Sequence, residues 1–371
     1  MRTALLYRDR LIPRSEAAFM RRQYVAFEAL SPYWLGCHFD DGLGDLGAPG
    51  HLLGRAGPLG AIDRALFKQA GIVPRVPYLG ALNPVVIHAH FGRGGALALP
   101  LARALGLPLV VSFHGGDATK DKHYRRQLIP TIYQRRLDAL KREAKLFVCV
   151  SDFIRRRLIE RGFPAAKLVV NRYGIEVEGV AEPRAPDTPP TVLFVGRFVE
   201  KKGIATLLDA MAILRTQGNP LRLTLVGDGE LGPLVAARAP ELGGIEQAGW
   251  LANAEVKRRM AGALALAVPS VTAKAGDAEG LPNVILEAMA AGIPVVGSDS
   301  AGIAEAIAHE RTGLVVPPGD APALAQALAR LAAEPALRQS MAQAGRARAV
   351  AEFSAPDQSR RLEQILLSVI P

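Results

Sequence analysis

The sequence is poor in the residues that mark several protein classes. Cysteine occurs twice in 371 residues, at Cys37 and Cys149, without any metal-ligand spacing. This argues against a disulfide scaffold and suits a reducing cytoplasm. Aromatic residues make up 6% of the chain and are not interleaved with its basic residues. A stacking platform for nucleic acid is therefore poorly supported.

Long apolar runs and a leader segment are also lacking. No uncharged apolar stretch approaches the ~18 residues of a membrane-spanning helix. The first residues, MRTALLYRDRLIPRSE, are interrupted by charge too early for a secretory signal. We therefore expect a cytoplasmic protein. With 49% hydrophobic and 22% charged residues, the chain can bury a large core, and its length predicts roughly two to three domains.

Several catalytic signatures are missing. No G-x-G-x-x-G directly follows the first predicted strand (3–8), which weighs against a nicotinamide dehydrogenase. The sequence has no G-x-S-x-G elbow and no Walker A loop. It also has no Asp-x-Asp pair that would hold a divalent metal against a diphosphate. We therefore expect neither a cofactor nor a metal.

Basic charge is concentrated in the first half of the chain. Residues 1–180 contain 27 Lys and Arg and 15 Asp and Glu, a balance of +12, whereas residues 181–371 contain 18 and 20, a balance of −2. The segment 120–145 alone has nine basic and three acidic residues. An anionic membrane surface, a phosphate-bearing substrate and nucleic acid all fit this pattern, as does an ordinary solvated surface.

Short β-branched runs alternate with helical patterns along most of the chain, which predicts parallel sheets covered on both faces. Helices are expected over 16–30, 95–105 and 152–161, the last with Ser151 as N-cap and Gly162 as its end. The predicted strands are 3–8, 84–90, 108–113, 145–150, 167–171, 191–197, 221–229, 264–270, 292–298 and 312–319.

A proline-rich stretch divides this pattern in two. We expect an N-terminal Rossmann-like domain over 1–177, a linker over 178–190 and a C-terminal Rossmann-like domain over 191–354. The helix at about 355–371 is expected to pack back onto the first domain. The predicted fold class is α/β, with two doubly wound domains facing a cleft.

The stretch VGRFVEKKG (195–203) combines cations with a helix start. Arg197 directly follows a predicted strand, and Lys202 precedes the next helix. Helix N-termini offer unpaired N–H groups and a partial positive charge, which suit a phosphate. Ordinary surface charges would explain this motif alone equally well.

The stretch DAEGLPNVILEAMAAG (277–292) places two carboxylates around another helix start. Glu279 lies in the loop before the helix that begins near Pro282, and Glu287 lies about one turn inside it. Carboxylates accept hydrogen bonds from vicinal hydroxyls, and the N–H groups of Asn283 and Val284 between them suit a diphosphate. The stretch therefore predicts a site for a nucleotide and a sugar, the alternative being a chance pair on a surface loop.

A third motif, VSFHGGDA (111–118), places His114 at the carboxyl end of a predicted strand, beside two glycines and Asp117. Ligands approach parallel sheets at this edge. A lone histidine is more often structural, but this position favours a functional one.

Together, GRFVEKKG, EGLPNVILEAMAAG and FHGGD resemble the retaining, metal-independent GT-B glycosyltransferases of group 1 (family 4), whose hallmark is the E-x7-E spacing of Glu279 and Glu287. The resemblance covers nearly the whole chain. The stretch LIPRSEAAFMRRQ (11–23) is similar to the subset active in colanic acid and amylovoran-type exopolysaccharide synthesis.

The resemblance implies roles for individual residues. Glu287 would bind the ribose, Arg197 and Lys202 the diphosphate, and Glu279 the donor sugar. His114 would face the transferred sugar near its anomeric carbon. The implied catalytic set is His114, Arg197, Lys202 and Glu279. The implied donor site is Gly196, Arg197, Lys202, Glu279, Gly280, Leu281, Asn283, Val284 and Glu287.

Two positions depart from the family pattern. Pro282 stands where many members have glycine, which removes one backbone donor. Ser15 and Glu16 stand where the family has a glycine-rich turn. The implied acceptor-side residues are Ser15, Glu16 and Asp117.

The resemblance thus implies a hexosyltransferase that uses a UDP- or GDP-linked sugar and acts on a glycan or polyprenyl-diphosphate-linked acceptor, in exopolysaccharide or cell-surface glycan synthesis. The segment 120–145 would contact an anionic membrane surface from the cytoplasmic side. A sugar-nucleotide epimerase of the same fold is the alternative enzyme. A basic nucleic-acid-binding protein is the alternative of another class.

Overall fold

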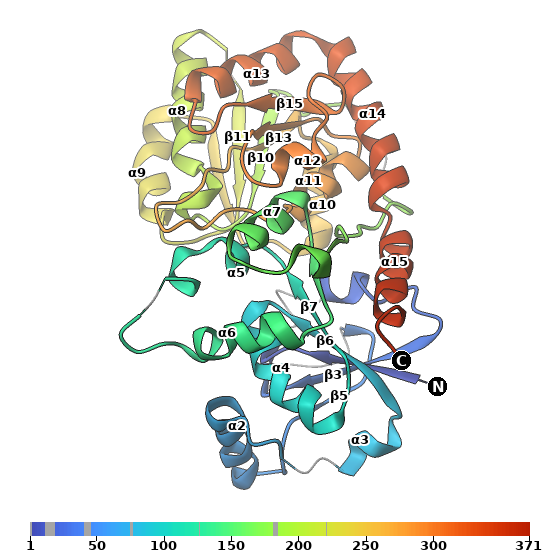
Figure 1. Ribbon diagram of the computed structural model, residues 1–371. Helices are drawn as coiled ribbons and strands as arrows, with labels where there is room; N and C mark the ends of the chain where they lie inside the picture. The colour runs from blue at the N-terminus through green and yellow to red at the C-terminus, as the bar shows by residue number, and fades with distance from the viewer. Residues whose placement is uncertain are drawn as a thin grey trace. The chain divides into compact units, whose positions relative to one another are not determined.

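The computed structural model describes residues 2–11, 19–40, 46–74, 77–125, 127–180, 185–219 and 221–371. The chain divides into two compact units. Unit 1 comprises Met1–Gly174 and Ala355–Pro371, and unit 2 comprises Ile175–Ser354. Each unit is a parallel sheet packed with helices (Figure 1), which confirms the predicted α/β class.

Unit 1 contains a seven-stranded sheet in the order β5-β3-β1-β6-β7-β8-β9, with all its strands parallel. Its strands are β1 (Arg2–Tyr7), β3 (Leu30–Gly36), β5 (Gly50–Leu52), β6 (Pro84–His90), β7 (Leu109–Phe113), β8 (Leu146–Cys149) and β9 (Leu168–Val170). The short strands β2 (Arg10–Leu11) and β4 (His38–Phe39) pair separately.

The helices of unit 1 include one from the far end of the chain. They are α2 (Pro58–Ala70), α3 (Pro77–Ala81), α4 (Gly92–Leu105), α5 (Gly116–Thr119), α6 (Ile132–Glu143), α7 (Asp152–Glu160) and α15 (Ala355–Leu367). In α15, Leu362 and Leu366 are buried in the same core cluster as Leu6 of β1 and Val86 of β6. The last helix is therefore part of the core of unit 1.

One predicted helix is wrong over much of its length. Of the stretch 16–30, the described part is helical only over 19–22, and β3 begins at Leu30. The N–H groups of Glu28, Ala29 and Leu30 donate to the Glu363 carboxylate on α15. A tertiary partner thus supplies the acceptor that a helical turn would have supplied. Ser15 and Glu16 lie outside the described residues.

Unit 2 contains a six-stranded parallel sheet in the order β12-β11-β10-β13-β14-β15. Its strands are β10 (Thr191–Val195), β11 (Arg222–Val226), β12 (Ile245–Gly249), β13 (Ala265–Val268), β14 (Val295–Ser298) and β15 (Gly313–Val316). Five of these correspond to predicted strands; the sequence patterns missed β12, whose residues are IEQAG.

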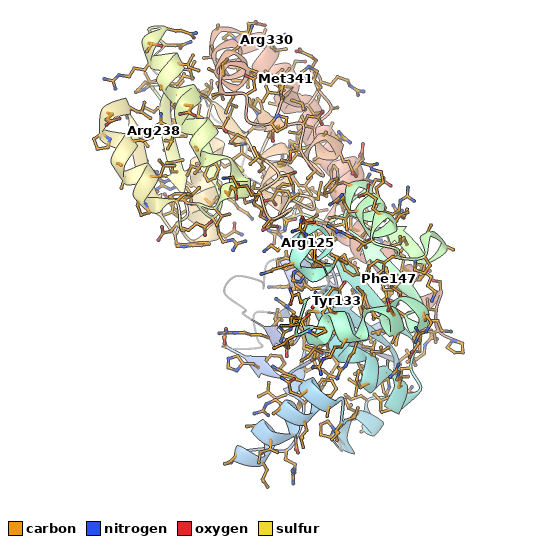
Figure 2. The ribbon with its side chains drawn as sticks, turned by 60° about the vertical axis from the view of Figure 1, so that its left-hand side comes forward. Arg125, Tyr133, Phe147, Arg238, Arg330 and Met341 are labelled. Atoms are coloured by element: carbon orange, nitrogen blue, oxygen red, sulfur yellow. The ribbon has the colours of Figure 1, made fainter. Side chains whose placement is uncertain are left out.

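The helices of unit 2 are α8 (Ile204–Thr216), α9 (Gly232–Leu242), α10 (Asn253–Ala261), α11 (Asn283–Ala290), α12 (Ile303–Ala306), α13 (Ala321–Ala333) and α14 (Pro335–Phe353). Helix α8 packs against α9 and α13, whereas α11 packs against α12 and α14. Met341 of α14 is buried in the core, while Arg330 of α13 pairs with Glu310 at the surface (Figure 2).

The strand order of unit 2 reverses at β10. From β10 the chain continues through β11 and β12 on one side, and then returns to β13 on the other. The carboxyl ends of β10 and β13 are therefore neighbours at a topological switch point, which is where ligands bind to doubly wound sheets. The motifs around Lys202 and Glu279 follow these two strands.

Candidate active site

The loops that follow β10 and β13 are joined at the switch point of unit 2. The Val271 N–H donates to the Lys201 carbonyl at 2.9 Å, and the Lys274 N–H donates to the Glu200 carboxylate at 3.2 Å. Gly203 has φ +67°, and a Cβ placed there would lie 1.8 Å from the Pro269 carbonyl oxygen. Glycine at this position thus allows the close approach that brings the two motifs together.

Four charged side chains meet between these loops. Lys202 Nζ lies 3.1 Å from Glu279 Oε1, and Lys201 Nζ lies 3.6 Å from the same oxygen. Lys201 Nζ also lies 3.3 Å from Asp277 Oδ1. The side chains of Lys201, Lys202 and Glu279 are only 12%, 16% and 11% exposed. Such shielded ion pairs are stronger than those on an open surface.

The two lysines also set the charge of Glu279. Burial by itself raises the pKa of a carboxyl group, but Lys202 and Lys201 outweigh that effect, so the pKa of Glu279 is lowered. Glu279 is therefore an anion at neutral pH, and its oxygens accept hydrogen bonds.

The α11 start lies directly after this cluster. Pro282 is the N-cap, with φ −68°, and the helix proper begins at Asn283. No side chain caps it, and the first N–H groups of a helix have no partner within the helix. The N–H groups of Asn283 and Val284 are thus the nearest helical donors to Glu279 in the sequence. Glu287 lies one turn further on and is half-buried.

Three buried oxygens at this site have no hydrogen bond among the described residues. They are Asn283 Oδ1, Ser270 Oγ at the end of the strand that precedes the loop, and Glu279 Oε1, which has its two lysines at ion-pair distance. Buried polar groups are normally paired, so unpaired ones at a strand end point to a polar ligand. The sequence patterns did not single out Ser270.

The remaining predicted donor-site residues lie around the same strand ends. Arg197 is exposed just beyond β10, and Gly280 and Leu281 are buried before α11. A Cβ at Gly196 would lie 3.4 Å from Lys202 Cε. The Lys202 side chain therefore passes close to Gly196 at the end of β10.

In unit 1, His114 follows β7 in an aromatic environment. Its Nδ1 lies 2.6 Å from Tyr173 Oη and its Nε2 lies 3.1 Å from His90 Nδ1. The rings of Phe19 and Phe91 contact the imidazole as well. Burial, together with the charge of Arg8, lowers the pKa of His114 well below its ordinary value, so the ring is neutral at pH 7.

Asp117 organises the backbone beside His114. Its carboxylate accepts hydrogen bonds from the N–H groups of His114 at 3.0 Å, Gly115 at 2.8 Å and Gly92 at 3.1 Å. Burial raises the pKa of Asp117, and these three donors partly oppose it. The side chain that the sequence suggested for the acceptor side thus holds the β7 loop to the start of α4.

Sequence reasoning missed several residues of these two clusters. In unit 2 they are Lys201 and Asp277, and in unit 1 they are His90 and Tyr173. The adjacent lysines of EKKG and the acidic pair of DAEG were signals for the first two. The position of His90 in HAH at the end of a predicted strand was a signal for the third.

Two features are absent from the ranges that the structure describes. None of the helices in those ranges has the length and apolar character needed to cross a bilayer. Across the same ranges, no three His, Cys, Asp or Glu side chains come together as a metal site would require.

Comparison with known proteins identifies the family. The model of "Glycosyl transferases group 1" matches residues 178–348, and that of "Glycosyltransferase Family 4" matches residues 49–178. The amylovoran biosynthesis glycosyltransferase AmsK of Erwinia amylovora is 35% identical over 285 residues, which cover 75% of this chain and 68% of AmsK. The chain belongs to the group 1 glycosyl transferases. The resemblance to the group 1 and family 4 glycosyltransferases is thereby confirmed.

Further relatives agree with this assignment. The putative colanic acid biosynthesis glycosyltransferase WcaL of Escherichia coli is 36% identical over 257 residues, covering 66% of this chain and 60% of WcaL. HepE of Anabaena, solved in complex with UDP, matches all of both chains with a TM-score of 0.78 at 20% identity. Sucrose-phosphate synthase of Thermosynechococcus elongatus has a TM-score of 0.74 at 21% identity. These structures confirm the GT-B fold, and the enzyme is a glycosyltransferase.

Proposed function

We propose that this enzyme is a retaining, metal-independent glycosyltransferase that moves a hexose from a nucleotide sugar to a glycan or lipid-linked acceptor in exopolysaccharide or cell-surface glycan synthesis. The observation that carries the proposal is the cluster of Lys201, Lys202 and Glu279 at the switch point of unit 2, directly before the α11 start.

Each part of that cluster suits one part of a UDP- or GDP-linked sugar. Glu279 would accept hydrogen bonds from hydroxyls of the sugar, and Glu287 would do so from the ribose. Arg197, Lys202 and the first N–H groups of α11 would hold the diphosphate. Gly196, Gly280 and Leu281 would shape the backbone around it.

The sharing of Glu279 between two lysines matters for this role. A diphosphate would compete with Glu279 for Lys202, and loss of a partner normally strands a buried charge at a high energetic cost. Lys201 lies 3.6 Å from the same carboxylate oxygen. It keeps Glu279 compensated while Lys202 turns toward a phosphate.

Departure of the nucleoside diphosphate places negative charge on its β-phosphate. Arg197, Lys202 and the α11 start would stabilise that charge without a metal ion. The family offers no accepted carboxylate nucleophile of the kind that retaining hydrolases use. We therefore propose attack by the acceptor hydroxyl on the face of the departing phosphate, which takes up the proton. His114 would contact the transferred sugar.

For the acceptor, we propose a polyprenyl-diphosphate-linked glycan reached at an anionic membrane surface on the cytoplasmic side. In the segment 120–145, Leu128 and Ile129 are 101% and 83% exposed, and Arg125 of the same loop is exposed as well. Apolar tips among cations bind anionic bilayers by combining burial with charge attraction.

Helix α2 adds a second apolar surface near this segment. Leu59, Ile62 and Leu66 are exposed and lie on one helical face by their spacing. Arg136 of α6 donates to the Lys68 carbonyl at the α2 C-terminus at 3.2 Å. This contact places the C-terminal end of α2 beside α6.

Neither alternative is favoured. The matching family models and relatives are glycosyltransferases and not epimerases. The basic charge has a use at a membrane or a phosphate-bearing substrate, and the chain lacks interleaved aromatic and basic residues for a nucleic acid.

The proposal is tested in two stages. A thermal-shift screen with UDP, GDP, ADP and their sugars identifies the donor. Turnover of that donor is then followed with EDTA present, and the configuration of the released or transferred sugar is read by NMR. We expect activity in EDTA and a first-formed product with the anomeric configuration of the donor. An inverted product or loss of activity in EDTA contradicts the proposal, and a rearranged nucleotide sugar indicates the epimerase.

Substitution of the neighbouring lysines separates the leaving-group role from general electrostatics. Lys202→Ala should lower kcat ~10²- to 10³-fold, by analogy with loss of an oxyanion donor. Lys201→Ala is the comparison variant, because it removes the lysine that compensates Glu279 and keeps the lysine proposed to bind the phosphate, and it should lower kcat less than Lys202→Ala does. Near wild-type kcat in Lys202→Ala, with folding intact, would show that the leaving-group role is wrong.

A further inference from the structure

His114 belongs to a continuous chain of hydrogen bonds inside unit 1. The chain joins three imidazoles, two phenols and one serine hydroxyl. Its bonds are Ser112 Oγ to His88 Nε2 at 2.7 Å, His88 Nδ1 to Tyr24 Oη at 2.8 Å, Tyr24 Oη to His90 Nε2 at 2.5 Å, His90 Nδ1 to His114 Nε2 at 3.1 Å, and His114 Nδ1 to Tyr173 Oη at 2.6 Å.

The sheet brings these groups together. His88 and His90 lie two positions apart on β6 and therefore point to the same face. His90 is directly opposite Ser112 on the neighbouring strand β7. The Trp34 ring of β3 stacks on His90 and makes an edge-to-face contact with Tyr24. Because the ring of each histidine packs against others, its two nitrogens have fixed partners.

Counting hydrogens limits the chain to two states. A neutral imidazole and a hydroxyl each carry one polar hydrogen, and each of the four interior groups makes two bonds within the chain. Each interior imidazole must then donate in one direction and accept from the other. Tyr24 must do the same, because a hydroxyl that accepted both bonds would leave its own buried hydrogen without an acceptor among the described residues. All five bonds therefore run from Ser112 to Tyr173, or all run the opposite way.

The buried end selects one direction. Ser112 Oγ is buried, and among the described residues His88 is its hydrogen-bond partner. If His88 donated to Ser112, the hydroxyl hydrogen of Ser112 would be buried without an acceptor, which is costly. Ser112 therefore donates, and all three histidines carry their hydrogen on Nδ1.

We propose that Tyr24, His88 and His90 are positioning residues that hold His114 in the Nδ1–H tautomer, with its ring fixed between His90 and Tyr173. The inference rests on the proposed contact of His114 with the transferred sugar for its consequence in transfer. In that orientation His114 donates to Tyr173, and the hydroxyl hydrogen of Tyr173 is not used within the chain. Because the other end stops at a buried serine, the chain does not conduct protons to solvent.

The surroundings keep the chain uncharged. Burial lowers the pKa of His88 to about 3 and that of His90 well below its ordinary value. The charges that face His114 are Arg8, which also lowers its pKa, and the Asp117 carboxylate, which accepts the His114 backbone N–H. The other contacts of the ring, Phe19, Phe91 and Tyr173, are neutral.

The tautomers are read directly by NMR of the full chain labelled with ¹⁵N-histidine. Long-range ¹H–¹⁵N spectra distinguish Nδ1–H from Nε2–H, and substitution of single histidines assigns the signals. We expect His88, His90 and His114 in the Nδ1–H form, unchanged between about pH 6 and 8. An Nε2–H signature, a mixture, or titration of His114 within that range overturns the inference.

Tyr24→Phe tests the positioning role, because it removes one hydroxyl and keeps the ring. His114 bonds to His90 and not to Tyr24, so an effect on His114 must pass along the chain. We expect mixed tautomers at His114. We also expect kcat to fall by at most ~10-fold, with an unchanged donor KM. Tyr33→Phe is the matched control: Tyr33 also bonds to a histidine, His51, outside the chain. It should change neither the tautomer nor kcat.

The outcomes separate this inference from the proposed function. An unchanged His114 signature in Tyr24→Phe overturns the positioning role whatever the activity. If the signature becomes mixed while kcat stays at the wild-type value, the chain does position His114. The proposed contribution of His114 to transfer is then wrong.

Discussion

At the scale of single residues, His88 links burial to pH. Burial lowers its pKa to about 3, compared with an ordinary value of 6.5 that the unfolded chain recovers. Between these two values the unfolded chain binds a proton that the folded chain does not. Unfolding is therefore favoured as the pH falls below 6.5, and the folded unit is most stable above that value.

We predict that the free energy of unfolding depends on pH, and that this dependence is weaker in His88→Asn. From about pH 7.5 to about pH 5, His88 alone should remove about 2 kcal/mol from the free energy of unfolding, and the variant should lack that share of the slope. The sequence has two tryptophans. A Trp250→Phe background leaves Trp34, which stacks on His90, as the reporter of unit 1 during urea unfolding.

The control for this measurement lies in unit 2. His309→Asn removes an exposed histidine far along the sequence and should leave the pH dependence of the Trp34 signal unchanged. Equal slopes in wild type and His88→Asn would mean that His88 is not held neutral by the fold.

At the scale of elements, α15 ties the end of the chain to the start of β3. Glu363 is 4% exposed, and its Oε1 accepts N–H hydrogen bonds from Glu28, Ala29 and Leu30 at 3.0, 2.8 and 2.9 Å. Ser359 accepts one more from Ala26 at 3.0 Å. Hydrogen bonds from several backbone N–H groups to one carboxylate stabilise the fold more than a single neutral hydrogen bond does.

We therefore expect Glu363→Ala to destabilise unit 1 by about 3 kcal/mol. The variant leaves the buried Leu30 N–H without an acceptor, whereas the N–H groups of Glu28 and Ala29 can bond to solvent. Glu363→Gln keeps one acceptor oxygen and should cost less. Gln364→Ala, at an exposed position of the same helix, controls for helix propensity. Urea unfolding measures all three, and an unchanged midpoint in Glu363→Ala would contradict a clamping role for α15.

At the scale of the whole molecule, charge and exposed apolar groups coincide in the first half of the chain. Residues 1–180 have a balance of +12 and residues 181–371 a balance of −2. The exposed leucine and isoleucine side chains of α2 and of the loop before α6 belong to the positive half. This asymmetry favours attachment of unit 1 to an anionic bilayer.

The prediction is binding to vesicles of phosphatidylcholine with about one third phosphatidylglycerol, weakened by salt, since each exposed Lys or Arg near such a surface contributes ~1 kcal/mol. The double variants Leu59→Ser/Ile62→Ser and Leu128→Ser/Ile129→Ser should each lower binding roughly tenfold or more by removing apolar contact. Vesicle flotation at low salt measures this.

Val350→Ser is the control, because Val350 is an exposed apolar residue of α14 in unit 2. It should leave binding unchanged. No flotation of the wild type with anionic vesicles, or equal flotation of all variants, would show that this surface does not attach to a membrane.

Local patterns were enough to locate most of the sheet and the E-x7-E motif. Buried parallel strands are continuous apolar runs, so β6, β10 and β13 were recognised from sequence. The Ser151 side chain accepts the Ile154 N–H as an N-cap, as its position before α7 predicted. Pro282 likewise marks the start of α11. Such signals are local because backbone geometry and capping depend on a few neighbouring residues.

Tertiary structure alone decided which side chains meet. Helix patterning extended over 16–30, but Glu363, more than 330 positions away, binds the N–H groups where β3 begins. Lys201 and Lys202 are neighbours in sequence, but only the fold brings the loop after β13 close enough for Glu279 to pair with both. His90 meets His114 only because β6 and β7 are adjacent. The sequence determined the elements and their end motifs, whereas the order of strands decided the contacts, because only it sets which ends are neighbours.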